Sequence, residues 1–187
     1  MTAEKIEIKR GLRDVYMDKT RSSFIDGGVG KLLYRGYDIS DLAKYSTFEE
    51  TVYLLLYESL PTRSELEALD AEMRANRGLT DEIIQVIRLI QKAHPMDVLR
   101  TVVSGLSTSD PDVGDNSREA TLRKGVRLSA QAPTIVAAHA RIRKGKEPVS
   151  PNASLSHAAN FLYMLFGEEP TLQDAKLIDK DFVLHAE

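Results

Sequence analysis

The chain has 187 residues, of which 42% are hydrophobic and 28% charged, with a formal net charge of −3. This composition is typical of one globular domain, and it gives no electrostatic reason to expect nucleic acid or membrane binding. Cysteine is absent, which excludes disulfides, thiolate metal sites and cysteine nucleophiles. The polar residues 1–10 lack the apolar core of a signal peptide, and no segment reaches the roughly 20 apolar residues that span a bilayer. We therefore expect a cytoplasmic protein.

The first predicted element is a β-hairpin over Ser22–Tyr37, where two short apolar runs flank Asp26-Gly27-Gly28. After Tyr37 the sequence follows helical periodicity almost throughout. The predicted helices of the first half, in chain order, are Asp38–Lys44, a helix capped at Ser46-Thr47, a charged helix from Thr62 or Ser64 to Arg77, and Thr80 to about His94.

The second half is predicted to be helical as well. Pro95 suits the first turn of a helix, and the polar loop 107–116 is expected to be the most mobile segment. Pro133 is expected to bend or divide a long helix, and Ser154 is a candidate N-cap. The predicted helices, in chain order, are Pro95 to about Leu106, Ser117–Arg143, Leu155–Phe166 closed by Gly167, and one from Thr171 that is still running at Glu187. The predicted fold is an all-α domain with one N-terminal β-hairpin.

The four histidines are the groups that titrate near neutral pH, and none has a partner at a motif spacing. Capping or packing accounts for His94 at its helix junction and for His157 near a helix start. His139 lies on a long helix and is expected to face solvent or a partner helix. His185 stands in the last helix. The residues alone therefore indicate no catalytic histidine.

Other chemical motifs are absent by the same reasoning. The carboxylate pairs Glu49-Glu50 and Glu168-Glu169 lie at helix starts or in loops, where the helix dipole accounts for them. The glycines at 27, 28 and 30 fit neither a Walker loop nor a Rossmann loop, so a turn is their expected role. The basic stretch Arg141–Lys146 is what the C-terminus of a helix prefers.

Several phrases, in order and in register, resemble the citrate synthase family, in its short bacterial and archaeal branch, which includes the 2-methylcitrate synthases. They are IDGGVGKLLYRGYDISDLA (25–43), STFEETVYLLLYESLPTRSEL (46–66), HPMDVLRTVVSGL (94–106), PTIVAAHARIRKG (133–145) and SHAANFLYMLFGEEP (156–170). The resemblance implies that the chain is the N-terminal part of the citrate synthase large domain. It implies no tightly bound cofactor and no metal.

The complete enzymes of this family condense acetyl-CoA or propionyl-CoA with oxaloacetate. They use an aspartate to remove a proton and two histidines to stabilise the enolate and polarise oxaloacetate. By the resemblance, these residues and the histidine that holds oxaloacetate lie beyond Glu187, so the chain alone is expected to be inactive. His185 is then expected to be a supporting neighbour of the substrate.

Two further residues are predicted from the resemblance. Arg13 stands where some relatives place an arginine near the phosphates of coenzyme A, a task that suits the guanidinium group. Arg74, in the charged helix, stands at a position that lies near substrate in enzymes of the short branch. The simpler interpretation is that it is a solvent-exposed residue of a charged helix.

The family also implies a homodimer. The helices that begin at Pro95 and Ser117 resemble the pair that forms its interface, and they carry more apolar and small residues than one small domain needs to bury. Those residues are Val102, Val103, Ser104, Gly105, Leu106, Val126, Ala130, Ala132 and Ala137. The alternative function is a helical interaction module without catalysis. A helix-turn-helix regulator is disfavoured by the acidic balance and the lack of a basic recognition helix.

Overall fold

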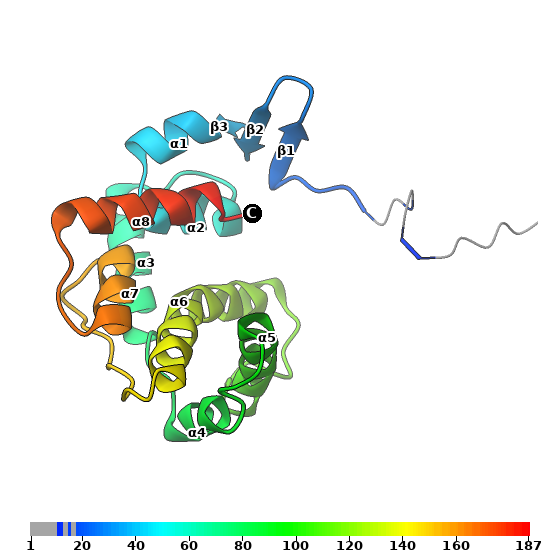
Figure 1. Cartoon of the computed structure of the whole chain (residues 1–187). Coiled ribbons are helices and arrows are strands. Elements are labelled where there is room, and N and C mark those ends of the chain that lie inside the picture. The colour runs from blue at the N-terminus through cyan, green and yellow to red at the C-terminus, as the bar shows by residue number, and fades with distance from the viewer. Residues whose placement is uncertain (1–10, 13–14, 16–17) are drawn as a thin grey trace, which may run out of the picture.

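The computed structural model describes residues 11–12, 15 and 18–187 and is mostly helical, which confirms the predicted fold class (Figure 1). Its strands are β1 (Ser23–Asp26), β2 (Lys31–Tyr34) and β3 (Tyr37–Asp38). Its helices are α1 (Ile39–Tyr45), α2 (Phe48–Tyr57), α3 (Arg63–Ala75), α4 (Asp81–Leu89), α5 (Pro95–Gly105), the 3₁₀ turn η1 (Leu106–Thr108), α6 (Arg118–Arg143), α7 (His157–Phe166) and α8 (Leu172–Leu184). Among the described residues, no helix is both long and apolar enough to cross a membrane.

The predicted hairpin is confirmed, and a third strand extends it. β1 pairs antiparallel with β2, with Ser23 opposite Tyr34. The chain then turns back at Arg35-Gly36, where both residues have positive φ (49° and 91°), and β3 pairs with β2. Two consecutive left-handed residues form the tight turn that suits twisted strands. Because arginine rarely adopts this conformation, Arg35-Gly36 is not a turn that residue types predict.

Most helix starts lie where the capping residues placed them. Thr47 and Thr62 each form a capping box with a glutamate three residues later. His94 caps α5, its Nδ1 accepting from the backbone N–H of Met96 (3.3 Å), with Pro95 in the first turn. The predicted cap of α7 was wrong: Ser156 caps it, while Ser154 hydrogen-bonds to the side chain of Asn152 in the preceding turn.

Three helix ends differ from their predictions. α3 ends at Ala75, since the Asn76 side chain binds the Glu72 carbonyl and leaves Arg77 outside the helix. α4 ends at Leu89, several residues before the predicted end, with Ile90 as its C-cap; His94, which precedes a proline, is extended with a ψ of 138°. α8 ends at Leu184, with His185 as its C-cap, so the prediction of a helix still running at Glu187 was wrong.

Pro133 does not divide α6. The helix is continuous from Arg118 to Arg143 and contains the proline. Its second half runs in a different direction from its first in Figure 1, in keeping with the bend that an internal proline causes. Buried residues before the proline (Val126, Ala130) and after it (Ile135, Ala138, Ile142) belong to different clusters of the core.

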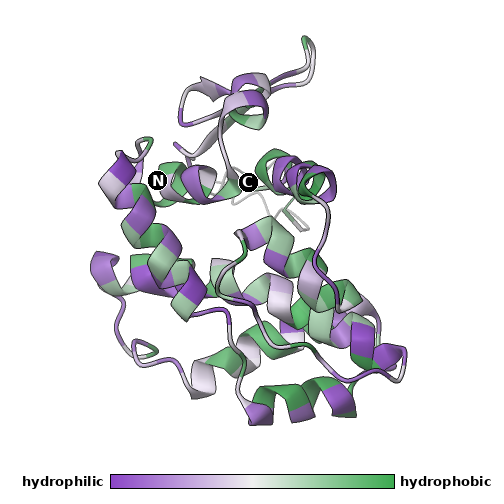
Figure 2. Ribbon diagram, turned by 90° about the vertical axis from the view of Figure 1, so that its left-hand side faces the viewer, coloured by the Kyte–Doolittle hydropathy of each residue, from purple (hydrophilic) through white to green (hydrophobic). Residues whose placement is uncertain are grey.

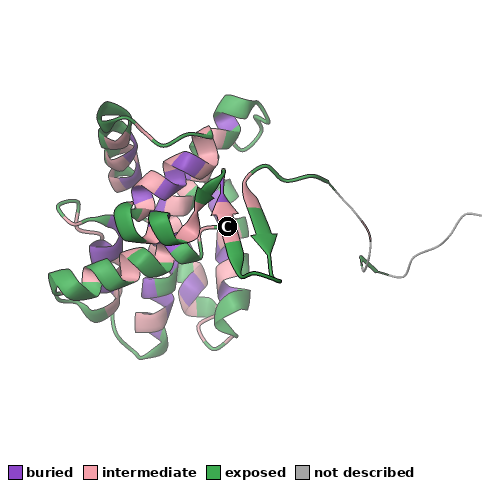
Figure 3. Ribbon diagram, turned by 90° about the horizontal axis from the view of Figure 1, so that it is seen from above, coloured by how far each residue is buried: buried purple, intermediate pink, exposed green. Residues whose placement is uncertain are grey.

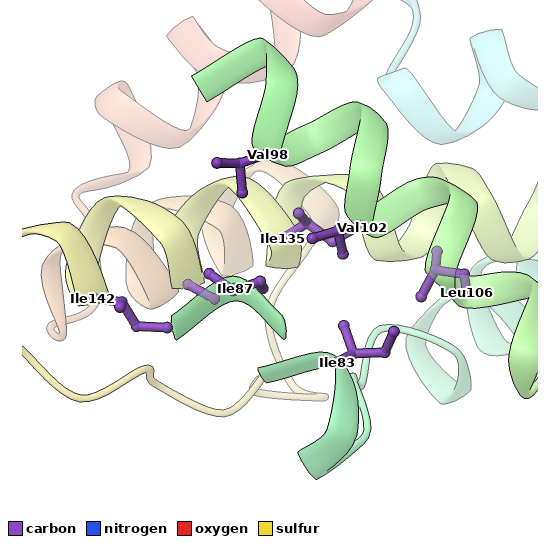
Figure 4. Close-up of a cluster of buried hydrophobic side chains, with 8 residues drawn as sticks. Ile83, Ile87, Val98, Val102, Leu106, Ile135 and Ile142 are labelled. Atoms are coloured by element: carbon purple, nitrogen blue, oxygen red, sulfur yellow. The ribbon is translucent and has the colours of Figure 1, made fainter. Parts of the chain in front are cut away.

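The core consists of three clusters of buried side chains, which come mainly from the apolar faces of the helices. Figure 2 shows the hydropathy of each residue, and Figure 3 shows how far it is buried. The largest joins α4, α5 and α6 (Figure 4), the second joins α2, α3 and α6, and the third joins the sheet to α1, α2 and α8. In the first, Ile83 and Ile87 pack against Val98, Val102 and Ile135. Each such side chain contributes about 1.5–3 kcal/mol by leaving water.

This packing corrects the prediction for five of the proposed interface residues. Val102, Leu106, Val126, Ala130 and Ala137 are all buried within the chain itself. These side chains are therefore unavailable for contact with a second chain, and Val103 is only partly exposed. The apolar side chains that α6 leaves exposed are Leu128 and Val136, at 40% and 41%.

The loop predicted to be most mobile is tied to α6 by ion pairs. Arg127 donates to the carboxylates of Asp110 (Nη2 to Oδ1, 2.7 Å) and Asp112 (Nη2 to Oδ2, 2.7 Å). Arg123 donates to Asp112 through Nε (3.1 Å) and Nη2. These arginines hold the pKa of Asp112 well below its usual range. The two aspartates fasten the loop along the first half of α6.

Candidate functional site

A pocket of about 490 Å³ lies at the C-terminal end of α8, where α2, α6 and the residues flanking the sheet meet. His185 lines this pocket together with Arg35, Phe48 and Ser129. The His185 side chain is 75% exposed, and its Nδ1 donates to the Asp181 carbonyl (2.9 Å). The predicted substrate neighbour therefore lies at the rim of a real pocket, with its Nε2 free of any hydrogen bond to a described residue.

The sheet holds this end of α8 in place. The Tyr34 hydroxyl donates to the Leu184 carbonyl (3.1 Å), and the Ser22 hydroxyl donates to Glu187 Oε1 (2.7 Å). On the opposite wall, Arg35 Nη2 donates to the Leu55 carbonyl near the end of α2 (3.1 Å). The strained turn at Arg35 thus fixes two walls of the pocket relative to one another.

Arg74 lies apart from this pocket and binds a loop. Its Nε donates to Asp70 Oδ2 (2.8 Å), and its Nη1 donates to the Leu155 and Ala153 carbonyls (2.8 and 2.5 Å). The side chain is 25% exposed. The guanidinium group is largely occupied by internal contacts, so the structure brings Arg74 and His185 into different surroundings. Arg13 lies outside the described residues.

Arg77 is a buried cation that sequence reasoning missed. Its side chain has no exposed surface, and Nη1 donates to the Leu155 carbonyl (2.9 Å). Nε and Nη2 have no hydrogen-bond partner among the described residues, and burial lowers the pKa of the guanidinium. Arg74 and Arg77 together clamp the loop before α7. Arg77 follows the end of a charged helix, a position that gives no sequence signal of burial.

Two buried or half-buried carboxylates cap helices other than their own. Glu49, on α2, accepts from the backbone N–H of His157 at the start of α7 (Oε1 to N, 3.0 Å). Asp179, on α8, accepts from the N–H of Phe48 at the start of α2 (Oδ1 to N, 3.0 Å). Burial raises the pKa of both carboxyl groups. Glu49 lies in the first turn of α2, as predicted, and its carboxylate in addition caps α7.

The other histidines have structural surroundings. His157 is 1% exposed and its ring stacks on Phe48, with centroids 5.1 Å apart. Burial, and then the charge of Arg77, lower the His157 pKa to about 3. His139 is also buried, and its Nε2 donates to the Gln91 carbonyl (3.1 Å), so of its two predicted surroundings the solvent was wrong. The long helix turns this side chain toward the α4–α5 connection.

Comparison with known proteins decides the family. The family model described as "Citrate synthase, C-terminal domain" matches residues 11–187. The chain belongs to the citrate synthase family. It is 47% identical to a citrate synthase of Haloferax volcanii, over 97% of this chain and 49% of that protein. It is 38% identical to a 2-methylcitrate synthase of Mycobacterium tuberculosis, over 98% of this chain and 47% of that protein.

Solved citrate synthase structures agree with the fold. The citrate synthase of Pyrobaculum aerophilum matches with a TM-score of 0.89 and 43% identity, over 94% of this chain and 46% of its own. The Thermoplasma acidophilum enzyme, in a ternary complex with carboxymethyl coenzyme A and oxaloacetate, matches with a TM-score of 0.88 and 26% identity, over 96% and 47%. The chain therefore spans about half the length of the citrate synthases it matches.

Proposed function

We propose that the complete protein condenses acetyl-CoA or propionyl-CoA with oxaloacetate, giving citrate or 2-methylcitrate and free CoA. The observation that carries this proposal is the likeness, over 96% of the chain, to a citrate synthase that holds carboxymethyl coenzyme A and oxaloacetate. Relatives of both kinds, citrate synthases and 2-methylcitrate synthases, support the two alternative acyl groups.

His185 is our candidate for a substrate neighbour. It lies at the rim of the pocket of about 490 Å³, and one ring nitrogen is already oriented by the Asp181 carbonyl. An imidazole fixed in this way carries its proton on Nδ1 and leaves Nε2 as a hydrogen-bond acceptor. That arrangement supports a role beside the substrate, in which Nε2 accepts a hydrogen bond from a donor group or a water molecule that itself binds oxaloacetate.

Arg74 and Arg13 stay predictions. For Arg74, the contacts with Asp70 and the loop carbonyls support a role in holding the loop before α7. A binding experiment separates the two roles, because Arg74→Ala weakens oxaloacetate binding directly only if the guanidinium reaches the substrate. For a purely structural residue, the variant lowers the free energy of unfolding and leaves the dissociation constant of the folded protein unchanged.

A thiol-release assay on the complete gene product tests the proposal. We expect CoA release that requires both oxaloacetate and an acyl-CoA, at roughly 1 to 1,000 turnovers per second. His185→Gln should raise the KM for oxaloacetate more than it lowers kcat, whereas the control His94→Asn, which keeps a capping side chain on α5, should leave both unchanged. A protein that releases no CoA under these conditions contradicts the proposal.

The 187-residue chain by itself is expected to release no CoA. Turnover by this chain at the rate of an ordinary citrate synthase would show that a different set of residues does the chemistry.

We also propose that the protein is a homodimer, with the exposed side chains Leu128 and Val136 of α6 in its interface. We further propose that the protein is cytoplasmic, and cell fractionation tests this.

A further inference from the structure

The ring of His157 is enclosed by aromatic side chains from two other helices. Phe48 of α2 stacks on it with an interplanar angle of 22°. Phe182 of α8 lies at a centroid distance of 6.0 Å and also contacts Phe48 (5.2 Å) and Phe161 (5.6 Å). Neither ring nitrogen of His157 has a hydrogen-bond partner among the described residues. The aromatic enclosure therefore favours the neutral imidazole, because a charged ring would be buried there without a hydrogen-bond acceptor or a counter-charge on its nitrogens.

The nearest charge makes protonation of this ring still less favourable. Arg77 is fully buried and its positive charge acts on His157. Other ionisable groups act on Arg77 and on Glu49, whose carboxylate binds the His157 backbone: they are Asp70, Arg74 and Asp179. Glu49 is bound to the backbone of His157, Asp70 to Arg74, and Asp179 to the backbone of Phe48, so each is already committed to another contact.

The helix that covers His157 lies at the edge of the domain. Among the residues of α8, Val183 is the one that is fully buried. Phe182 packs on Phe48 and Phe161, and Asp179 and the Leu184 carbonyl make polar contacts with the Phe48 N–H and Tyr34. Opening of α8 breaks these contacts but leaves intact the core cluster of α4, α5 and α6, to which α8 contributes no residue. Lifting it removes Phe182 from the enclosure and gives His157 access to water.

We propose that His157, with Phe48 and Phe182 around it, forms an acid-sensitive latch that releases α8 from the rest of the domain as pH falls. When α8 is closed, the ring stays neutral. When α8 is open, the ring regains its ordinary affinity for a proton, so each proton bound below about pH 6.5 stabilises the open form. The helix carries His185 at its end, so acid would also withdraw that residue from its pocket; this last consequence rests on the proposed function, whereas the latch does not.

The size of the effect follows from the two proton affinities of the ring. With a pKa of about 3 in the closed form and about 6.5 in the open form, the open fraction rises roughly 100-fold between pH 7 and pH 4.5. Glu49 and Asp179 act in the opposite direction, since burial raises the pKa of each carboxyl group and acid then relieves a buried charge. The value of 100 is therefore an upper limit.

Hydrogen exchange of the backbone amides at pH 7 and pH 4.5, corrected for the intrinsic effect of pH, tests the latch. We expect the protection of α8 to fall by up to about 100-fold, while that of α5 in the core changes much less. His157→Phe keeps an aromatic ring that cannot be protonated and should abolish the difference. His94→Asn alters an exposed capping histidine and should preserve it.

Two results overturn the latch. One is protection of α8 that is independent of pH, or that falls in parallel with α5, which indicates global unfolding. The other comes from NMR titration of the wild-type imidazole, which serves if His157→Phe does not fold. A ring that titrates near pH 6.5 while α8 stays protected shows that the closed form accepts the proton, whereas a ring that stays neutral until α8 opens supports the latch.

Discussion

The carboxylate of Glu49 accepts a hydrogen bond from the backbone N–H of His157 (3.0 Å), so a residue of α2 caps α7. Helix starts leave several N–H groups without a partner, and a buried one is costly to leave unpaired. We expect Glu49→Ala to lower the free energy of unfolding by about 1–2 kcal/mol. Urea denaturation measures this. Glu67→Ala, which removes an exposed carboxylate paired with Arg63, should change stability by no more than about 0.5 kcal/mol; equal effects would contradict the prediction.

The same carboxylate predicts a pH dependence of stability. Burial raises the pKa of Glu49 above its ordinary value of 4.5. The folded state then binds the proton more tightly than the unfolded state, so the stability that this proton confers is complete below pH 4.5 and is lost as pH rises through the folded pKa. Glu49→Gln keeps an accepting oxygen and cannot ionise. Its stability relative to wild type should therefore rise between pH 4.5 and neutral pH, and a difference that falls over that interval would show that the carboxylate is better stabilised in the folded state.

Most helix starts were predictable from the local sequence, and the buried polar residues were not. Thr47, Thr62 and Thr80 cap helices through contacts within three residues of themselves, which is information that the local sequence contains. The burial of Arg77 and His157 depends on residues from other helices, as does the cap that Glu49 provides. A single sequence does not encode such long-range contacts in a pattern that can be read from spacing.

The family resemblance predicted that His185 lies near substrate, and this stays a prediction. The structure shows only that His185 lines a pocket. The resemblance gave no hint that Arg35 has positive φ and joins the sheet to the end of α2. It also assigned Val102 and Val126 to an interface, because small and apolar residues on a helix read the same whether they face a partner or the core.

The ion pairs of the loop before α6 give a third prediction. Asp112 accepts from both Arg123 and Arg127, so removing its charge should loosen the loop. We expect Asp112→Asn to increase the rate of proteolytic cleavage within residues 109–116, with little change in the exchange of core amides. The matched control is Asp97→Asn, which weakens an exposed pair with Arg100 on α5. Cleavage of the loop at the wild-type rate would mean that backbone turns alone hold it.

The same loop should respond to salt. Ion pairs near the surface weaken as ionic strength rises, because the screening length shrinks from about 10 Å at 0.1 M to about 3 Å at 1 M. Wild-type cleavage within 109–116 should therefore accelerate with sodium chloride and approach that of Asp112→Asn. Protease activity on an unfolded reference peptide, measured at each salt concentration, removes the effect of salt on the enzyme itself.

The last prediction concerns self-association through α6. Leu128 and Val136 are eight positions apart, which places them on one face of the helix, and they are 40% and 41% exposed. Large apolar side chains on one face of a helix are typical of an interface, and a charge placed there must be desolvated when the interface forms. We therefore expect Val136→Glu to shift the protein toward monomer, as sedimentation equilibrium at tens of micromolar measures. Leu89→Glu is the control, since it places the same charge at an apolar residue that is 84% exposed on a different helix, α4. If both variants sediment as the wild type does, the face of α6 that holds Leu128 and Val136 is not the interface.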